Sequence, residues 1–119
     1  MAVWQRAMDL AEAVYLATRS FPKEETFGLS SQVRRAVISI PANIAEGAAR
    51  HGTKEYLQFL SIARGSLAEL QTLLELAQRI GFLSSSQAGS LNPLVKEVSA
   101  LLGGLIASLR RRTSISPKP

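Results

Sequence analysis

The stretch SSQVRRAVISIPANIAEGAAR, residues 30–50, decides the predicted fold, because an apolar repeat passes through a proline without losing its phase. The repeat has spacings of four, three and four residues, which is the period of an α-helix. Its members are Val33, Val37, Ile40 and Ile44. A proline inside a helix removes a backbone donor and costs about 3 kcal/mol, yet a helix that ended at Pro41 would leave Ile44 no reason to keep the same face. The repeat therefore predicts one helix over about residues 31–48, bent at the proline.

Three further segments, about 3–19, 53–80 and 91–112, repeat apolar residues at the same period. A hydroxyl just before such a repeat can accept a hydrogen bond from a free amide of the first turn, so Ser30 and Thr53 are the predicted caps of the second and third helices. In the first segment an amphipathic helix is predicted, because Trp4, Met8, Ala11 and Tyr15 recur three or four residues apart, with Leu10 and Val14 beside them. In the second and third segments, the residues predicted to be buried at the centre of the stripes are Val37, Ile40, Leu60, Leu67 and Leu74.

Four amphipathic helices joined by short connections predict an all-α fold, an antiparallel up-down-up-down four-helix bundle. We expect the bundle domain to cover residues 1–112 and residues 113–119 to form a flexible basic C-terminal tail. The third segment has a wider apolar face than one bundle core needs, which favours a homo-oligomer. The residues that widen it are Phe59, Ile62, Leu73, Leu76 and Ile80.

The net charge of +5 is concentrated near one end of the sequence. The last ten residues, RRRTSISPKP, hold four basic side chains and no acidic one, so residues 1–109 hold ten basic and nine acidic ones. Within that body, residues 34–64 carry five basic side chains against Glu46 and Glu55. Such a local excess favours an anionic partner, and nucleic acid is the partner that we expect.

The sequence gives little support for catalysis. It contains no cysteine, which excludes disulfides and thiolate metal sites. Its one histidine, His51, has no second histidine with which to build a metal site. Phosphate-binding loops and nucleophile elbows of known pattern are also missing. We therefore expect no enzyme activity, no catalytic residue, no metal and no cofactor.

Membrane insertion is not expected either. The longest nearly uncharged stretch, VSALLGGLIASL at residues 98–109, is shorter than the roughly 20 residues that a spanning helix needs. Asp9 and Glu12 interrupt the apolar pattern near the N-terminus, which is not typical of a signal peptide. Together with the lack of cysteine, these features favour a cytoplasmic protein.

The polar groups near Pro41 have two readings. Asn43 and Glu46 could contact a ligand, or they could satisfy backbone groups that the proline frees, and we favour the second reading. Asn43 is one candidate donor for the Val37 carbonyl; a side chain from a neighbouring helix or subunit, or a water, are the others.

Two more predictions concern contacts between helices. If the second and third helices pair antiparallel, Arg35 lies level with Ser66 and Glu69, and an ion pair between Arg35 and Glu69 is plausible. Gly103 and Gly104, inside the fourth segment, predict a close helix contact or a local bend, since two glycines cost a helix roughly 2 kcal/mol.

These considerations divide the candidate residues into two groups. The residues expected to contact nucleic acid are Arg34, Arg50, Lys54, Arg64, Arg110, Arg111 and Arg112. The residues expected to serve structure or assembly are Arg35, Pro41, Asn43, Glu46, Glu69, Gly103 and Gly104.

Three stretches of the sequence resemble the four-helix bundle protein family. They are WQRAMDLAEAVY, FPKEETFGLSSQVRRAVISIPANIAEGAAR and EYLQFLSIARGSLAEL, and the resemblance covers about residues 4–83. The family includes proteins encoded by intervening sequences in bacterial 23S rRNA genes, and the accessory variability determinant of diversity-generating retroelements. The resemblance implies a bundle that assembles into a ring, pentameric in known members, and in the retroelement branch a protein that binds nucleic acid and a reverse transcriptase.

Two functions remain open from the sequence. The first is a non-enzymatic, ring-forming accessory protein that binds RNA or DNA, in its retroelement form as the partner of a reverse transcriptase. The second is a 23S rRNA intervening-sequence protein that acts as a protein–protein scaffold without specific nucleic-acid binding.

Overall fold

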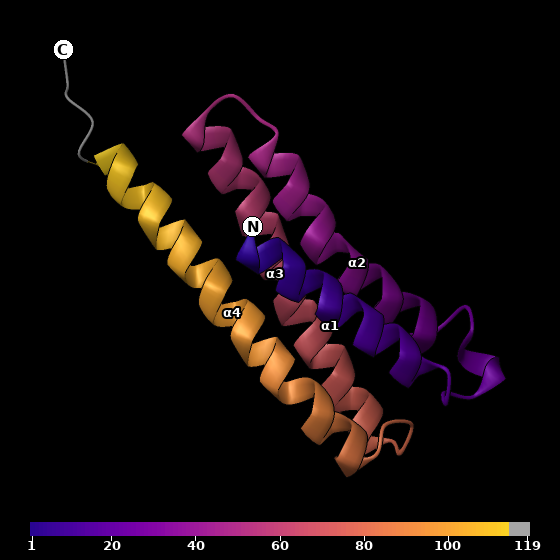
Figure 1. The fold of residues 1–119 in the computed structure, drawn as a ribbon. Coiled ribbons are helices and arrows are strands. Elements are labelled where there is room, and N and C mark those ends of the chain that lie inside the picture. The colour runs from indigo at the N-terminus through magenta and orange to yellow at the C-terminus, as the bar shows by residue number, and fades with distance from the viewer. Residues whose placement is uncertain (115–119) are drawn as a thin grey trace.

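Four α-helices make up the described part of the protein, residues 1–114 of the computed structural model (Figure 1). They are α1 Ala2–Thr18, α2 Leu29–Ala48, α3 Thr53–Arg79 and α4 Ser85–Ser114, and a short 3-10 helix, η1, covers Lys23–Glu25. These residues contain no strand. Each helix packs against two neighbours in the order α1, α2, α3, α4 and back to α1. Consecutive helices run in opposite directions, so the predicted all-α antiparallel four-helix bundle is confirmed.

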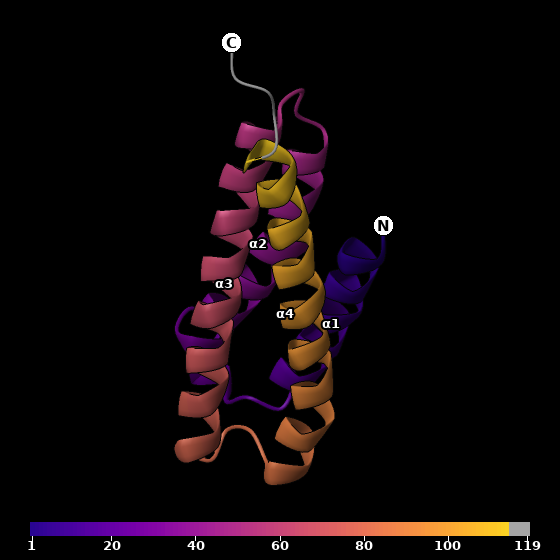
Figure 2. The same cartoon turned by 90° about the vertical axis from the view of Figure 1, so that its left-hand side faces the viewer.

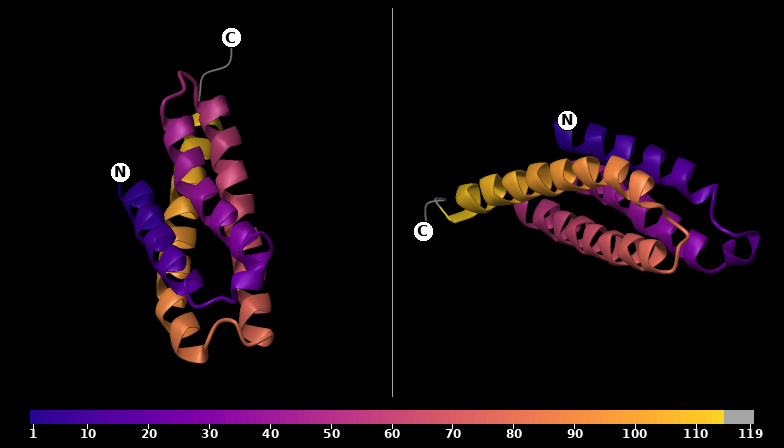
Figure 3. Two further views of the ribbon diagram at one scale, coloured as in Figure 1. Left: turned by 90° about the vertical axis from the view of Figure 1, so that its right-hand side faces the viewer. Right: turned by 90° about the horizontal axis from the view of Figure 1, so that it is seen from below.

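The helices differ in length, and this gives the bundle two unlike ends. The whole measures 58 × 25 × 21 Å. α1 has 17 residues, against 27 in α3 and 30 in α4. The N-terminus therefore lies part-way along the bundle, while the α2–α3 connection and the last turns of α4 lie together beyond it, at one end (Figures 2 and 3). The α3–α4 connection and η1 lie at the opposite end.

The core predicted for α2 and α3 is confirmed. All five residues at the centre of the two stripes are buried, and Leu74 is the most exposed of them at 8%. α2 continues through Pro41, which is itself buried, as the unbroken repeat predicted. In the described residues, no helix combines the length and the apolar character that crossing a bilayer requires.

The apolar repeat noted in α1 lies beside the core, whereas Leu10 and Val14, next to that repeat, are fully buried. Met8 and Tyr15 are 41% and 38% exposed, and Trp4 and Ala11 are only half-buried. Both rows recur at helical spacing, but the row of mostly smaller side chains lets α1 approach its neighbours more closely. The residues of α1 that enter the core are Val3, Ala7, Leu10, Val14 and Thr18.

Both predicted N-terminal caps are wrong. The Leu29 amide donates to the Glu25 carboxylate at 2.9 Å, so the first turn of α2 is capped from η1, while Ser30 is buried inside the helix. A glutamate side chain can reach this amide because the 3-10 turn carries it back over the helix end. Thr53 is the first residue of α3, and the preceding Gly52 makes no side-chain cap.

The connection between α3 and α4 is fixed by two terminal motifs. Gly81 has a φ of +86°, and the Phe82 amide donates to the Ala77 carbonyl at 2.8 Å, which is the bond of a Schellman motif. The Ser84 hydroxyl and the Gln87 side chain then cap each other's backbone amides at 3.0 and 2.8 Å, a capping box. The box starts α4 at Ser85, six residues before the predicted start.

The end of α4 also differs from the prediction. The helix continues to Ser114, two residues beyond the predicted domain boundary at 112. The rest of the predicted tail, residues 115–119, lies outside the described residues.

Polar contacts join α1 to α4. The Arg6 guanidinium donates to Asp9 at 2.6 Å within α1 and to Glu97 of α4 at 2.9 Å. The hydrogen bond to Glu97 raises the pKa of Arg6, so the charge that holds this contact is permanent. Further along the same seam, the Gln87 amide donates to the Ser20 hydroxyl at 3.1 Å.

Candidate nucleic-acid interface

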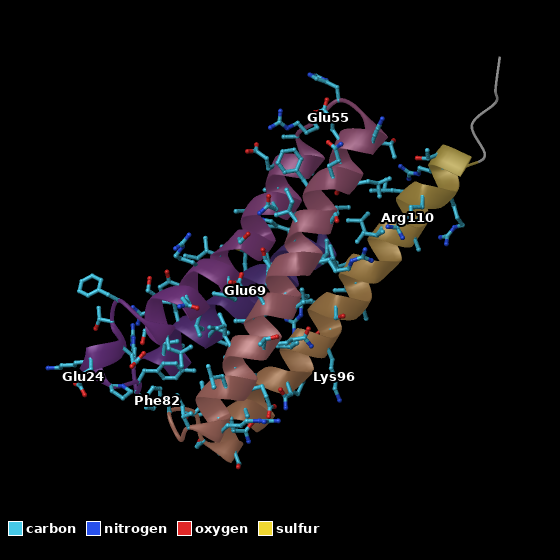
Figure 4. All side chains as sticks on the ribbon, turned by 180° about the vertical axis from the view of Figure 1, so that it is seen from behind. Glu24, Glu55, Glu69, Phe82, Lys96 and Arg110 are labelled. Atoms are coloured by element: carbon cyan, nitrogen blue, oxygen red, sulfur yellow. The ribbon has the colours of Figure 1, made fainter. Side chains whose placement is uncertain are left out.

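The structure brings five of the seven predicted nucleic-acid contacts to one end of the bundle. Arg50 and Lys54 flank the α2–α3 connection, and Arg110, Arg111 and Arg112 belong to the last turns of α4. Figure 1 shows that these two places lie at the same end, and Figure 4 shows the labelled Glu55 and Arg110 there. We call the surface formed by these five residues the basic end.

Lys54 and Arg110 are the most available cations of the basic end. Both are exposed, and within residues 1–114 neither takes part in an ion pair or a side-chain hydrogen bond. Arg64 is also exposed and unpaired within residues 1–114. It lies outside the basic end, about three turns beyond Lys54 along α3. These cations keep their hydrogen-bond capacity for an external anion such as phosphate.

Arg50 is less free than predicted. Its guanidinium lies 4.8 Å from the centre of the Phe59 ring, within the range of a cation–π contact. Its Nη2 is 3.9 Å from a Glu46 oxygen, and its Nε is 4.0 Å from a Glu55 oxygen. The Arg50 side chain therefore has partners within the chain, two carboxylates and a ring, and its contact with nucleic acid stays a prediction.

A close approach of α2 and α3 holds Phe59 in place beneath Arg50. A Cβ atom at Gly47 would lie 2.8 Å from the Cβ of Phe59 and 2.9 Å from Cδ1 of Tyr56, closer than real atoms pack. Gly47 lies inside α2 and is buried. Burial raises the pKa of Tyr56, so this phenol stays neutral near pH 7.

Arg34 does not belong to the basic end. Its Nε donates to the Thr18 hydroxyl at 2.9 Å, and its guanidinium lies 5.1 Å from the centre of the Tyr15 ring. The side chain is half-buried between α1 and α2. Its contacts are those of a residue that fastens α2 to α1.

Asn43 links α2 to α3. Its amide donates to the Ser39 carbonyl at 2.8 Å and to the Ser39 hydroxyl oxygen at 2.9 Å. The Ser66 hydroxyl of α3 donates to the same Ser39 oxygen at 2.8 Å. The structural reading of Asn43 fits this network, although the amide meets the Ser39 carbonyl rather than the Val37 carbonyl. A donor for the Val37 carbonyl stays a prediction.

The register predicted for Arg35 and Glu69 is confirmed, but their ion pair is not. Both line one polar groove of about 400 Å³ between α2 and α3, together with Ser39 and Ser66. No ion pair joins them in the described part of the chain. Each long side chain is exposed, so hydration competes with a surface pair that contributes little.

Gly103 and Gly104 make no close helix contact within the protein. Both are exposed, and a Cβ atom added at either would meet nothing within 4 Å. The predicted contact is therefore wrong for the single chain. His51 is also exposed, and across residues 1–114 no group of three or more His, Asp or Glu side chains is placed to hold a metal.

Fold and site together define an all-α four-helix bundle with a group of five basic residues at one end. The comparisons are consistent with this class. The chain belongs to the 23S rRNA-intervening sequence protein family, whose sequence model matches residues 1–104. The matched part includes Arg50 and Lys54 and ends before Arg110.

A solved structure has the same fold. It is the crystal structure of a protein of unknown function from the S23 ribosomal protein family of Bacteroides thetaiotaomicron. The two chains are 28% identical and superpose with a TM-score of 0.79, over 87% of this chain and 97% of the other. A comparison with curated proteins gave no match.

Proposed function

We propose that this protein is a non-enzymatic accessory protein that binds nucleic acid through its basic end. The observation that supports this most strongly is the placement at one end of Arg50 from the α2–α3 connection, Lys54 from α3 and Arg110 from α4. The acidic side chains near the α2–α3 connection, Glu46 and Glu55, do not cancel five cations. A phosphate backbone binds such a surface because condensed counterions are released.

We further propose that the protein works as a ring-shaped homo-oligomer, most simply a pentamer. Two separate apolar surfaces support this. One, on the outer side of α3, is formed by Ile62, Leu76 and Ile80, which are 46–52% exposed. The other, a shallow groove between α1 and α2, includes Met8, Tyr15 and Ile38. Because α1 and α3 are diagonal in the bundle, these surfaces face different directions, as a head-to-tail ring requires.

A ring would strengthen weak phosphate contacts. Each subunit would present its own basic end, and every contact after the first would form at a high effective concentration. In the retroelement form of this proposal, a reverse transcriptase is the protein partner that works on the bound nucleic acid.

The proposal is tested by a titration of nucleic acid at two salt concentrations. We expect a Lys54→Ala, Arg110→Ala variant to bind more weakly and with a shallower dependence on salt, because fewer counterions are released. The matched control is Lys23→Ala, Lys96→Ala, which removes the same charge from exposed, unpaired positions outside the basic end. Equal losses in the two variants would show that net charge, and not the basic end, determines binding.

A protein–protein scaffold is the second candidate function. The exposed apolar residues of α3 and of the α1–α2 groove favour it, since apolar patches mark protein contacts. Under this reading the protein assembles normally and its affinity for nucleic acid is weak and unaffected by the basic-end substitutions.

A further inference from the structure

The guanidinium of Arg50 is held in a defined orientation at the tip of the bundle. The Phe59 ring lies 4.8 Å from the guanidinium carbon. The N–H groups of Nη2 and Nε are near the carboxylates of Glu46 and Glu55, at 3.9 and 4.0 Å. The arginine side chain is nonetheless 42% exposed.

The Phe59 ring and the two carboxylates contact different parts of the guanidinium: the ring lies near its carbon, and the carboxylates lie near its N–H groups. A phosphate binds arginine through the N–H edge, and here that edge is shared with two carboxylates that repel phosphate. A nucleobase binds arginine through the flat face, by stacking. The guanidinium carbon of Arg50 lies over the Phe59 ring, and no other ring contact of Arg50 occurs within residues 1–114. The arrangement therefore suits a base better than a phosphate.

The support beneath Arg50 is rigid. Phe59 is a half-buried residue of α3. Because Gly47 has no side chain, the Cβ of Phe59 lies close to the α2 backbone. Arg50 itself follows α2 directly, in the short connection to α3. A platform that is already in position loses little conformational entropy when a base stacks on it.

We propose that Arg50 on Phe59 is a stacking platform for an unpaired base, so the nucleic acid that the basic end selects is single-stranded. This rests on the proposed function and names its ligand class. In the interior of a duplex both faces of a base are covered by neighbouring bases, whereas a single strand can turn a base onto the platform. Lys54 and Arg110, exposed and unpaired in the described chain, contact the phosphates beside it.

The test compares a single strand containing 2-aminopurine with a duplex of the same length, at the same salt concentration. We expect the wild-type protein to prefer the single strand and to quench 2-aminopurine fluorescence. Arg50→Lys keeps the charge but removes the plane, so it should weaken single-strand binding on the order of tenfold and abolish the quenching, and weaken duplex binding much less. Lys54→Ala should instead weaken both forms and flatten the salt dependence.

Phe59→Leu provides a second variant that leaves Arg50 in place but removes the ring. It should reduce quenching as Arg50→Lys does, and circular dichroism and sedimentation serve to check its fold and its oligomeric state. Wild-type binding that is equally tight for duplex and single strand, or full quenching by Arg50→Lys, would overturn the platform while leaving the proposed function standing. Absence of salt-dependent binding to either form would overturn both.

Discussion

Replacing Gly47 with alanine should destabilise the protein, although the same change stabilises most helices. Gly47 lies inside α2, and alanine is favoured over glycine in a helix interior by up to about 1 kcal/mol. Against this, the new methyl group would lie 2.8 Å from the Cβ of Phe59 and 3.3 Å from the carbonyl oxygen of Tyr56. The sign of the effect depends on which of these terms is larger.

The steric term is larger because the atoms that must move are tied to the backbone. The Tyr56 ring can rotate, but a Cβ and a carbonyl oxygen move only with α3 itself. Inserting a methylene group into a packed site costs about 1–3 kcal/mol. Allowing for a gain in helix propensity of about 1 kcal/mol, we expect Gly47→Ala to lower the free energy of unfolding by up to about 2 kcal/mol.

Gly103→Ala is the matched control. It adds the same methyl group to an exposed helical position that has nothing within 4 Å, so it should raise the free energy of unfolding by up to about 1 kcal/mol. Urea unfolding of both variants, followed by circular dichroism at one protein concentration, measures the difference. If Gly47→Ala is as stabilising as Gly103→Ala, the close approach of α2 and α3 is not as described. If Gly103→Ala disrupts assembly, that glycine contacts another subunit.

Three further predictions concern the helices themselves. Leu67→Ala removes a core side chain that is 2% exposed and should cost about 2–5 kcal/mol of unfolding free energy in urea; a cost below about 0.5 kcal/mol would contradict the bundle. Glu25→Ala removes the acceptor of the Leu29 amide and should cost about 1 kcal/mol, seen as a lower melting temperature, while Glu25→Gln should keep most of the stability. Asn43→Ala breaks the link to Ser39 and should lower stability without changing nucleic-acid affinity in protein that is folded and assembled; a folded, assembled variant that no longer binds would make Asn43 part of the binding site.

The parts of the fold that a long hydrophobic repeat determines could be predicted from the sequence. α2 and α3 have one dominant apolar row each, so their buried residues and the passage through Pro41 followed from spacing alone. α1 has two adjacent rows, 3-7-10-14 and 4-8-11-15, and periodicity does not choose between them; packing does. The cap by Glu25 depends on the path of η1, which no local pattern shows. The start of α4, in contrast, has a local signal, because residues 84–87, SSSQ, have the pattern of a capping box.

The candidate site was predictable in charge but not in geometry. Antiparallel topology places the α2–α3 connection and the end of α4 together, so the gathering of Lys54 with Arg110 follows from the fold class. The contact of Arg50 with the Phe59 ring does not follow from the fold class, because it depends on the close approach of α2 and α3 at Gly47. The contacts of Arg34 with Thr18 and Tyr15 could not be predicted either, because these partners lie on a different helix.

The seam between α1 and α4 has a consequence for how the bundle forms. The other three helix pairs are neighbours in the sequence, so each closes only a short connection. The Arg6–Glu97 and Ser20–Gln87 contacts join residues 91 and 67 positions apart. The entropy of loop closure grows with the length of chain that is closed, and contacts distant in sequence slow folding. Three of the four helix pairs are thus local in the sequence and one, α1 with α4, is long-range. We expect the formation of the α1–α4 contact to limit the rate of folding.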